Sequence, residues 1–451
     1  MRTEIQKYPA YKDSGVEWLG EIPCHWEVKK LKFIGNIYAG LNGKKGDDFT
    51  KEFSSGIKSY IPFTNICNNL KISENQFHFV KVNENEKQNK VLIYDILFLM
   101  SSETLEDIGK NSIYVGNNEE LYLNSFCKGF RILSNRVNPE YVNYLFSSLT
   151  YRSYFSLVGR GFTRINLKQE FINDSFALLP PLSEQTAIAA FLDRKTALID
   201  QAIDIKQKQI ELLKERRQIL IHKAVTRGLN PNVKMKDSGV EWIGEVPEGW
   251  EVKKLRYLAN CFPSNIDKHS KPNEKEVRLC NYTDVYKNDF ITDDMELMIA
   301  TATIEQIAKF TLKEGDIVIT KDSETANDIA VPTYIKEKLT NVVCGYHLAV
   351  IRTNQESYSK YLFQALKTKL FNAQFEVCSN GITRVGLGNS DLKNGYFLLP
   401  SKQEQIEIAE YIETGVKKIA TAITLKEQEI EKLKEYKGTL INSAVTGKVK
   451  V

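Results

Sequence analysis

The sequence has no hydrophobic run of the about eighteen residues that a membrane-spanning helix needs, so a membrane protein is not predicted. Its beginning, MRTEIQKYPAYKD, lacks the apolar stretch of a secretory signal, and a cytoplasmic location is expected. The seven cysteines are odd in number, are scattered along the chain and never form a C-x-x-C pair. This usage argues against a disulfide framework and against a zinc site.

An excess of charge of one sign is also missing. The 61 Lys and Arg nearly balance the 57 Asp and Glu, so a nucleic-acid partner would have to be held by local basic patches. The chain contains no Walker-A GKS or GKT sequence and no NPP[FY] or DPP[FY] loop of the kind used in base methylation. An ATP-driven motor and a self-contained DNA methyltransferase are therefore not predicted, and we expect neither catalytic residues nor a metal or cofactor site in this chain.

What the sequence does contain is a long internal repeat. The segment KDSGVEWLGEIPCHWEVKKL at residues 12–31 returns at residues 236–255 as KDSGVEWIGEVPEGWEVKKL, with 16 of 20 positions identical. Such a repeat indicates a tandem duplication and hence two domains of the same fold. We expect the tryptophans of these segments to pack the domains onto a rod of long helices. They are all four tryptophans of the chain: Trp18, Trp26, Trp242 and Trp250.

A second repeated block begins with LLP at residues 178 and 398 and ends in AVT. Its apolar residues recur with steps of 4, 7, 4, 7, 3 and 7, which places them in one seam of a helix. Residues 183–226 are predicted to form a helix of about 66 Å that pairs with its own duplicate as an antiparallel coiled coil, and Gly228 and Gly447 would end the two helices. The seam consists of Ile188, Leu192, Ile199, Ile203, Ile210, Leu213 and Leu220, and of Ile408, Ile412, Ile419, Ile423, Ile430, Leu433 and Leu440.

The regions at residues 32–177 and 256–397 combine short strand-like runs, such as VLIYDILFLM and EGDIVIT, with short helical segments. They share the elements SET-x-x-DI and G-x-TR but otherwise diverge. The predicted fold class is therefore mixed α/β (α+β). Two duplicated globular domains would be separated by the pair of long antiparallel helices, in a pseudo-twofold circular arrangement.

The SGVEW-[LI]-GE-[IV]-P-x-x-WEVKKL segment, the G-x-TR element, an LP-x-x-x-EQ helix start and a long helix ending in AVT each occur twice, in the same order. Together they resemble the specificity subunit of Type I restriction-modification enzymes over nearly the full length. The resemblance implies target-recognition domains at residues 1–177 and 231–397, and long-helix regions at residues 178–230 and 398–451. Each domain would read one half of a split DNA target, and the helices would set the length of the unread spacer.

The resemblance also implies partners. They are double-stranded DNA, two methylation subunits that bind S-adenosylmethionine, and two restriction subunits that use ATP and Mg. The subunit itself would catalyse nothing.

Candidate DNA contacts follow from side-chain chemistry, because Arg, Asn and Gln read base edges while Lys, Thr and Ser hold phosphates. The basic loop GLNGKKG and the Asn-rich segment IPFTNICNN are candidates, although solvated turns would explain both equally well. The Thr-Arg pair of G-x-TR is common to both domains, so we assign it to backbone contact or to folding, and assign base reading to divergent positions. The predicted contacts are Lys44, Lys45, Thr64, Asn65, Asn68, Arg160, Thr163, Arg164, Asn281, Tyr282, Lys321, Thr383 and Arg384.

Two alternatives stay open on the residues alone. One is a coiled-coil adaptor without DNA binding, whose end domains bind proteins. The other is an orphan specificity subunit that varies by recombination and serves a methyltransferase only. The lysines and arginines along the long helices are equally ambiguous, because a charged helix face is most often solvated but would also suit DNA phosphates.

Overall fold

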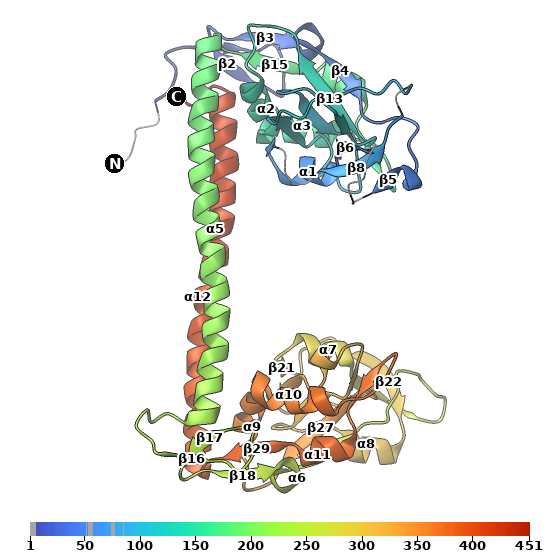
Figure 1. Cartoon of the computed structure of the whole chain (residues 1–451), viewed down its shortest axis with the longest axis vertical. Helices are drawn as coiled ribbons and strands as arrows, with labels where there is room; N and C mark the ends of the chain where they lie inside the picture. The colour runs from blue at the N-terminus through green and yellow to red at the C-terminus, as the bar shows by residue number, and fades with distance from the viewer. Residues whose placement is uncertain (1–5, 51, 53–56, 74–76, 84) are drawn as a thin grey trace. The chain divides into compact units, whose positions relative to one another are not determined.

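The computed structural model describes residues 6–50, 52, 57–73, 77–83 and 85–451, so the first five residues of MRTEIQKYPAYKD lie outside the described part. The protein is mixed α/β and divides into two compact units (Figure 1). The first unit comprises residues 1–206 and 427–451, and the second comprises residues 207–426. The expected fold class and the duplication are confirmed, since the two units repeat the same succession of elements.

The first unit is built on a five-stranded sheet with the order β4-β13-β9-β11-β7. The central strand β9 has the sequence ILFL and is buried at every position, as expected for a strand that is covered on both faces. Ile96 and Phe98 face one core with helices α2 (Pro139–Ser147) and α3 (Leu149–Val158). Leu97 and Leu99 face a second core under a smaller sheet. The strands of the main sheet are β4 (Gly35–Ala39), β13 (Cys127–Ile132), β9 (Ile96–Leu99), β11 (Asn111–Tyr114) and β7 (Lys71–Ile72).

The remaining elements of the first unit surround this sheet. The smaller sheet has the order β12-β6-β8-β5, and β15 pairs with β3 next to the start of the long helix α5. The bounds are β1 (Tyr11–Asp13), β2 (Glu21–Pro23), β3 (Glu27–Lys30), β5 (Phe49–Thr50), β6 (Ile57–Ile61), α1 (Phe63–Asn68), β8 (His78–Lys81), β10 (Ser101–Ser102), β12 (Leu121–Leu123), α2 (Pro139–Ser147), α3 (Leu149–Val158), β14 (Ile165–Asn166), α4 (Gln169–Asn173) and β15 (Phe176–Leu179).

The second unit repeats the plan with a sheet of order β19-β27-β23-β25-β21 and a smaller sheet β22-β20-β26. Its central strand β23, IVIT, is again buried at every position. The bounds are β16 (Met235–Asp237), β17 (Glu245–Pro247), β18 (Glu251–Lys254), α6 (Leu255–Leu258), β19 (Ala259–Pro263), β20 (Lys275–Cys280), α7 (Tyr282–Lys287), β21 (Phe290–Ile291), β22 (Met298–Ala302), α8 (Ile304–Phe310), β23 (Ile317–Thr320), β24 (Asp322–Ser323), β25 (Pro332–Ile335), β26 (Val342–Cys344), β27 (Leu348–Thr353), α9 (Ser359–Leu366), α10 (Lys369–Cys378), β28 (Val385–Gly386), α11 (Asn389–Asn394) and β29 (Tyr396–Leu399).

The long helices are α5 (Leu182–Arg227) and α12 (Lys402–Val445). Within the first unit, Lys437 Nζ lies 2.7 Å from Asp200 and Lys206 Nζ lies 2.5 Å from Glu429, so the numbering falls along α12 as it rises along α5. The helices are therefore antiparallel there, and Figure 1 shows them side by side. All fourteen residues of the predicted seam are buried or half-buried. Those that are buried are Ile188, Leu192, Ile199, Ile210, Ile408, Ile412, Ile419 and Ile430, and those that are half-buried are Ile203, Leu213, Leu220, Ile423, Leu433 and Leu440.

Both long helices end as the sequence predicts. Gly228 and Gly447 follow the last helical turns with φ of +72° and +71°, a left-handed conformation that glycine adopts at low cost. In α5 the N–H of Gly228 donates to the carbonyl of Ala224 (3.2 Å). In α12 the N–H of Lys448 donates to the carbonyl of Ser443 (2.9 Å).

The repeated tryptophans explain the LP-x-x-x-EQ helix starts. The indole N–H of Trp26 donates to Glu184 in the first turn of α5 (3.1 Å), and that of Trp250 donates to Glu404 in the first turn of α12 (3.0 Å). Both indoles are buried, so the first turn of each long helix is fastened to its globular unit. The other two tryptophans pack elsewhere than expected: Trp18 stacks on Tyr154 of α3 (4.4 Å between rings), and Trp242 meets Phe371 of α10 edge-on (6.3 Å).

The neighbouring glutamine of the motif has a separate task. Gln185 accepts a hydrogen bond from the N–H of Asn138 (2.8 Å), just before α2, and Gln405 does the same for Tyr358 before α9 (2.7 Å). Each side chain thus satisfies an unpaired N–H at a helix start. None of the helices within the described ranges combines the length and the apolar character needed to cross a membrane.

Candidate nucleic-acid interface

The G-x-TR element forms the same tight loop in both units, directly after α3 and after α10. In the first unit the loop is closed by two backbone hydrogen bonds between Arg160 and Asn166 (3.1 and 2.8 Å). In the second unit Asn380 and Gly386 close it in the same way (3.1 and 2.9 Å).

The glycine of the loop is required by the backbone. Gly161 and Gly381 have φ of +152° and +150°, and a Cβ at either position would collide with the carbonyl oxygen of the loop arginine, Arg164 or Arg384. Only glycine fits this geometry without strain. The sequence G-x-TR therefore specifies a loop shape rather than a chemical reaction.

The loop presents its following residues to solvent. Phe162 and Ile382 are fully exposed, at 106% and 107%, and the Thr163–Arg164 and Thr383–Arg384 pairs are exposed as well. Each unit thus displays an apolar side chain and a guanidinium side by side on one rigid loop.

The two loop arginines are held differently. In the first unit the guanidinium of Arg164 lies over the ring of Phe126, 4.7 Å from its centroid, which is a cation–π contact. In the second unit Arg384 lies 3.2 Å from Nε2 of His347, and Nδ1 of His347 lies 3.2 Å from Asp322. Because arginine only donates, Nε2 accepts in this arrangement and Nδ1 carries the proton that it donates to Asp322.

Phe126 and His347 occupy equivalent positions. Each directly precedes the longest strand of its five-stranded sheet, β13 or β27. The carbonyl of each accepts a backbone hydrogen bond from the residue that precedes the short strand β10 or β24. These bonds are Met100 N–H to Phe126 (2.9 Å) and Lys321 N–H to His347 (2.8 Å). The loop arginine therefore contacts the ring of Phe126 in the first unit, and in the second unit it contacts His347, which in turn contacts Asp322.

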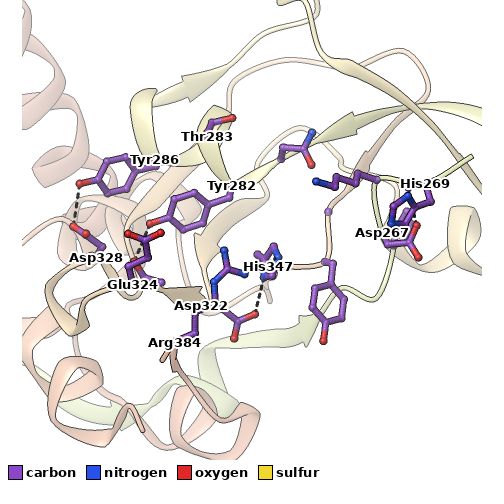
Figure 2. Close-up of a pocket in the computed structure, with 16 residues that line it drawn as sticks. Asp267, His269, Tyr282, Thr283, Tyr286, Asp322, Glu324, Asp328, His347 and Arg384 are labelled. Atoms are coloured by element: carbon purple, nitrogen blue, oxygen red, sulfur yellow. Dashed lines mark hydrogen bonds and ion pairs between the residues drawn. The ribbon is translucent and has the colours of Figure 1, made fainter. Parts of the chain in front are cut away.

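In the second unit, Asp322, His347 and Arg384 border a hollow of about 670 Å³. Figure 2 shows Tyr282 and Tyr286 of α7 on one side and the His347–Asp322 pair on another. The two tyrosine rings stack with centroids 5.6 Å apart, and the hydroxyl of Tyr286 donates to Asp328 (3.0 Å), which raises the pKa of that tyrosine. A concave surface with stacked rings and convergent polar groups suits recognition of a planar, hydrogen-bonding ligand.

The hollow brings together three of the predicted contacts, because Asn281, Tyr282 and Arg384 all line it. Lys321 lies beside them, with Nζ 4.9 Å above the ring of Tyr346 and 3.5 Å from Asp322. Thr383 stays on the exposed loop.

The candidates of the first unit are more dispersed, and one expectation about them was wrong. The segment IPFTNICNN is not a reader loop or a turn: Pro62 ends the extended stretch, and Phe63–Asn68 form the short helix α1. One helical turn directs Asn65 inward, at 6% exposure, so its side chain is closed to a duplex. Thr64 and Asn68 stay exposed on the same helix.

The basic candidates of the first unit are partly engaged by the protein itself. Lys44 lies 2.5 Å from Glu86 with a side chain that is only 6% exposed, and this contact lowers the pKa of Glu86. The guanidinium of Arg160 donates to the carbonyls of Leu157 (2.5 Å) and Gly159 (2.9 Å) at the end of α3. Lys45 remains exposed.

Comparison with known proteins shows to which family the chain belongs. The family of Type I restriction modification DNA specificity domains matches residues 23–215 and again residues 247–435. The chain belongs to this family. The double match coincides with the duplication, and members of the family named as specificity subunits are non-catalytic, so this chain is a recognition subunit and not an enzyme.

Relatives within the specificity family match most of the length of the chain. A putative type I restriction enzyme MjaX specificity subunit of Methanocaldococcus jannaschii is 26% identical and is covered to 96%, as is this chain. The EcoKI specificity subunit of Escherichia coli is 23% identical over 87% of this chain and 82% of its own length. A chain from a structural study of assembly and conformational transition of the type I R-M system shares the fold, with a TM-score of 0.69 at 14% identity, over 94% of this chain and 98% of that one.

Several residues of this specificity-family surface were not predicted. His347 is not among the predicted contacts, yet it contacts the shared arginine. Tyr286 and Asp322 were also missed. Part of this surface could have been found from the sequence, because a large apolar residue stands between Gly and Thr in both loops. The role of the position before β13 or β27 needed the structure, which shows that this residue contacts the loop arginine in both units.

Proposed function

We propose that this chain is the DNA specificity subunit of a Type I restriction-modification enzyme, in which each unit reads one half of a bipartite, asymmetric target. The observation that carries the proposal is the repeated loop. Its Gly, Thr and Arg are the same in both units, whereas the residues around it differ, with Phe126 in one and His347 in the other. A loop that is the same in both units would bind the DNA backbone in the same way, and the different residues around it would let each unit recognise different bases.

The proposal divides the work among the residues. Thr163, Arg164, Thr383 and Arg384 would hold the sugar–phosphate backbone, because their loops are common to both units. Asn281, Tyr282 and Lys321 in the second unit, and Thr64 and Asn68 in the first, would contact base edges. Lys45 would add a phosphate contact, whereas Lys44, Asn65 and Arg160 are engaged within the protein and serve its folding.

Partners complete the proposed activity. Two methylation subunits carrying S-adenosylmethionine and two restriction subunits using ATP and Mg would assemble on the long-helix regions at residues 178–230 and 398–451. The recognition domains would be residues 1–177 and 231–397, and the complex would act in the cytoplasm.

The test is reconstitution of the full chain with the methylation subunit on a pool of random duplexes, followed by sequencing of adenine methylation. One bipartite motif with an unread spacer is expected. A complex that selects no sequence at any salt concentration would instead favour the adaptor alternative. A second reconstitution that adds restriction subunits tests the orphan alternative, which predicts that the motif is still methylated but never cleaved.

A further inference from the structure

The most exposed large apolar side chains in the described part of the chain are Phe162 and Ile382, at 106% and 107%, and the next is Val377 at 84%. Both stand at the same place in the shared loop, between its glycine and its threonine. Two independent copies therefore display an apolar group where nothing in its own unit covers it. An exposed large apolar group in a repeated, rigid position indicates a binding role rather than a folding role.

Backbone hydrogen bonds close the loops that carry these side chains. The backbone bridges at Arg160–Asn166 and Asn380–Gly386 close each loop, and the glycine turn fixes its path. The neighbouring arginines are themselves held, Arg164 by the Phe126 ring and Arg384 by His347. Each tip thus combines a projecting apolar group with one fixed positive charge.

We propose that Phe162 and Ile382 are wedges that enter between adjacent base pairs, one in each half of the DNA target, while Arg164 and Arg384 hold the flanking phosphates. Proteins that kink DNA insert Phe, Ile, Leu or Met side chains between base steps in this manner. The inference rests on the proposed function, and it adds a local distortion of the duplex to the reading of its bases.

The wedge also has a chemical purpose. A base that is methylated must leave the stack, and an already unstacked step makes that extrusion less costly. One wedge in each half of the target would serve a methylated adenine on each strand. The guanidinium beside each apolar tip favours DNA over a protein as the partner, because a guanidinium binds the phosphate that lies next to an opened base step.

The experiment uses the full chain with its methylation subunits on the target duplex, with 2-aminopurine placed in turn at each position of both half-sites. Fluorescence of this base rises when it is unstacked. We expect a rise at one step in each half-site for the unchanged protein. Phe162→Ala should abolish the rise in one half-site only and Ile382→Ala in the other, and each should weaken target binding about tenfold.

Type-matched controls lie elsewhere on the surface. Phe33 and Ile304 are 73% and 69% exposed, and Phe33→Ala and Ile304→Ala should leave the fluorescence unchanged. The conservative variants Phe162→Leu and Ile382→Leu should restore the signal, because leucine also wedges. Since both tips are free of internal contacts, thermal unfolding should be unaffected in all of these variants.

The outcomes separate the wedge from the proposed function. If the motif is selected but 2-aminopurine responds equally in the alanine variants, the wedge is wrong and the specificity function stands. If the alanine variants lose the methylation subunits instead, the tips bind protein and the wedge is again wrong. If the unchanged protein selects no motif, the proposed function itself fails.

Discussion

At the scale of single residues, the two units fasten the same arginine by different chemistry. In the second unit His347→Ala removes the acceptor that faces Arg384, and we expect binding to the half-site of that unit to weaken by about 1–2 kcal/mol, or about tenfold. His347→Gln should retain most of the affinity, because an amide accepts from Arg384 and donates to Asp322 at the same time. Fluorescence anisotropy on the target duplex measures the effect.

The first unit supplies the control for this change. His347→Phe copies the way in which Phe126 holds Arg164, so it should also retain affinity, by a cation–π contact in place of a hydrogen bond. Discrimination in the other half-site should not change in any variant. Equal losses for the Ala, Gln and Phe variants would mean that His347 does not position the arginine.

An ion pair with a buried carboxylate gives a prediction about stability. Asp95, whose side chain is 2% exposed, accepts two hydrogen bonds from Arg131 (2.9 and 2.7 Å) and one from Tyr38 (2.7 Å). The hydrogen bonds that Arg131 donates to Asp95 raise the pKa of the arginine. Asp95→Ala leaves the arginine uncompensated and should lower the free energy of unfolding of the first unit by about 3–5 kcal/mol in urea denaturation.

The same chain offers matched comparisons for that measurement. Asp316 and Arg352 repeat the pair in the second unit (2.7 and 2.6 Å), so Asp316→Ala should destabilise that unit to a similar degree. Asp174 pairs with Lys32 at the surface (2.7 Å), so Asp174→Ala should lower the free energy of unfolding far less than the two variants with a buried carboxylate. Equal effects of the buried and surface variants would contradict the argument.

At the scale of elements, patterns that repeat along the chain were predictable and surfaces assembled from distant segments were not. The heptad-like seam identified α5 and α12, and Gly228 and Gly447 marked their ends, because helix periodicity and capping are local. The short helix α1 was missed, since six residues carry too little periodicity to distinguish a helical turn from a loop. The contact between His347 and Arg384 joins residues 37 positions apart. It depends on two sheets, because β27 pairs with β23 in one and β28 pairs with β24 in the other.

The joint between each globular unit and its long helix can be tested at the same scale. Trp26→Ala and Trp250→Ala remove a buried ring and its hydrogen bond to Glu184 or Glu404, so each should destabilise its unit by about 3–5 kcal/mol. Hydrogen exchange should rise in the first turns of α5 and α12. Trp242→Ala should cost less, because that indole is 40% exposed.

The methylated motif separates the joint from the reading surface. Neither tryptophan lies at the G-x-TR loops or in the hollow of the second unit, so the preferred bases should stay the same in both variants while assembly or activity falls. A changed motif would show that the joint takes part in reading the target.

At the scale of the whole molecule, the duplication has kept the scaffold and varied the surfaces. The Trp–Glu joint, the Gln that caps a helix start and the glycine loop are the same in both units, whereas Phe126 and His347, or Met100 and Lys321, differ at equivalent places. On the proposed function, such a chain would change its target by altering residues around a shared loop, while its fold stays the same.

The long helices contribute residues to both units, which allows the proposed spacer to be tested. Residues 182–206 of α5 belong to the first unit and residues 207–227 to the second, so an insertion after Lys206, matched by one after Lys426 in α12, touches neither globular core. Three heptads in each helix keep the seam in register and add about 31 Å. Because one turn of B-DNA measures about 34 Å, we expect the unread spacer of the methylated motif to lengthen by about nine or ten base pairs while both half-sites stay the same.

A control protein with a single inserted heptad in each helix gains only about 10 Å, which would place the half-sites on different faces of the duplex. This protein should bind more weakly to targets of every spacer length. If the three-heptad protein still methylates the original spacer, the helices do not set it.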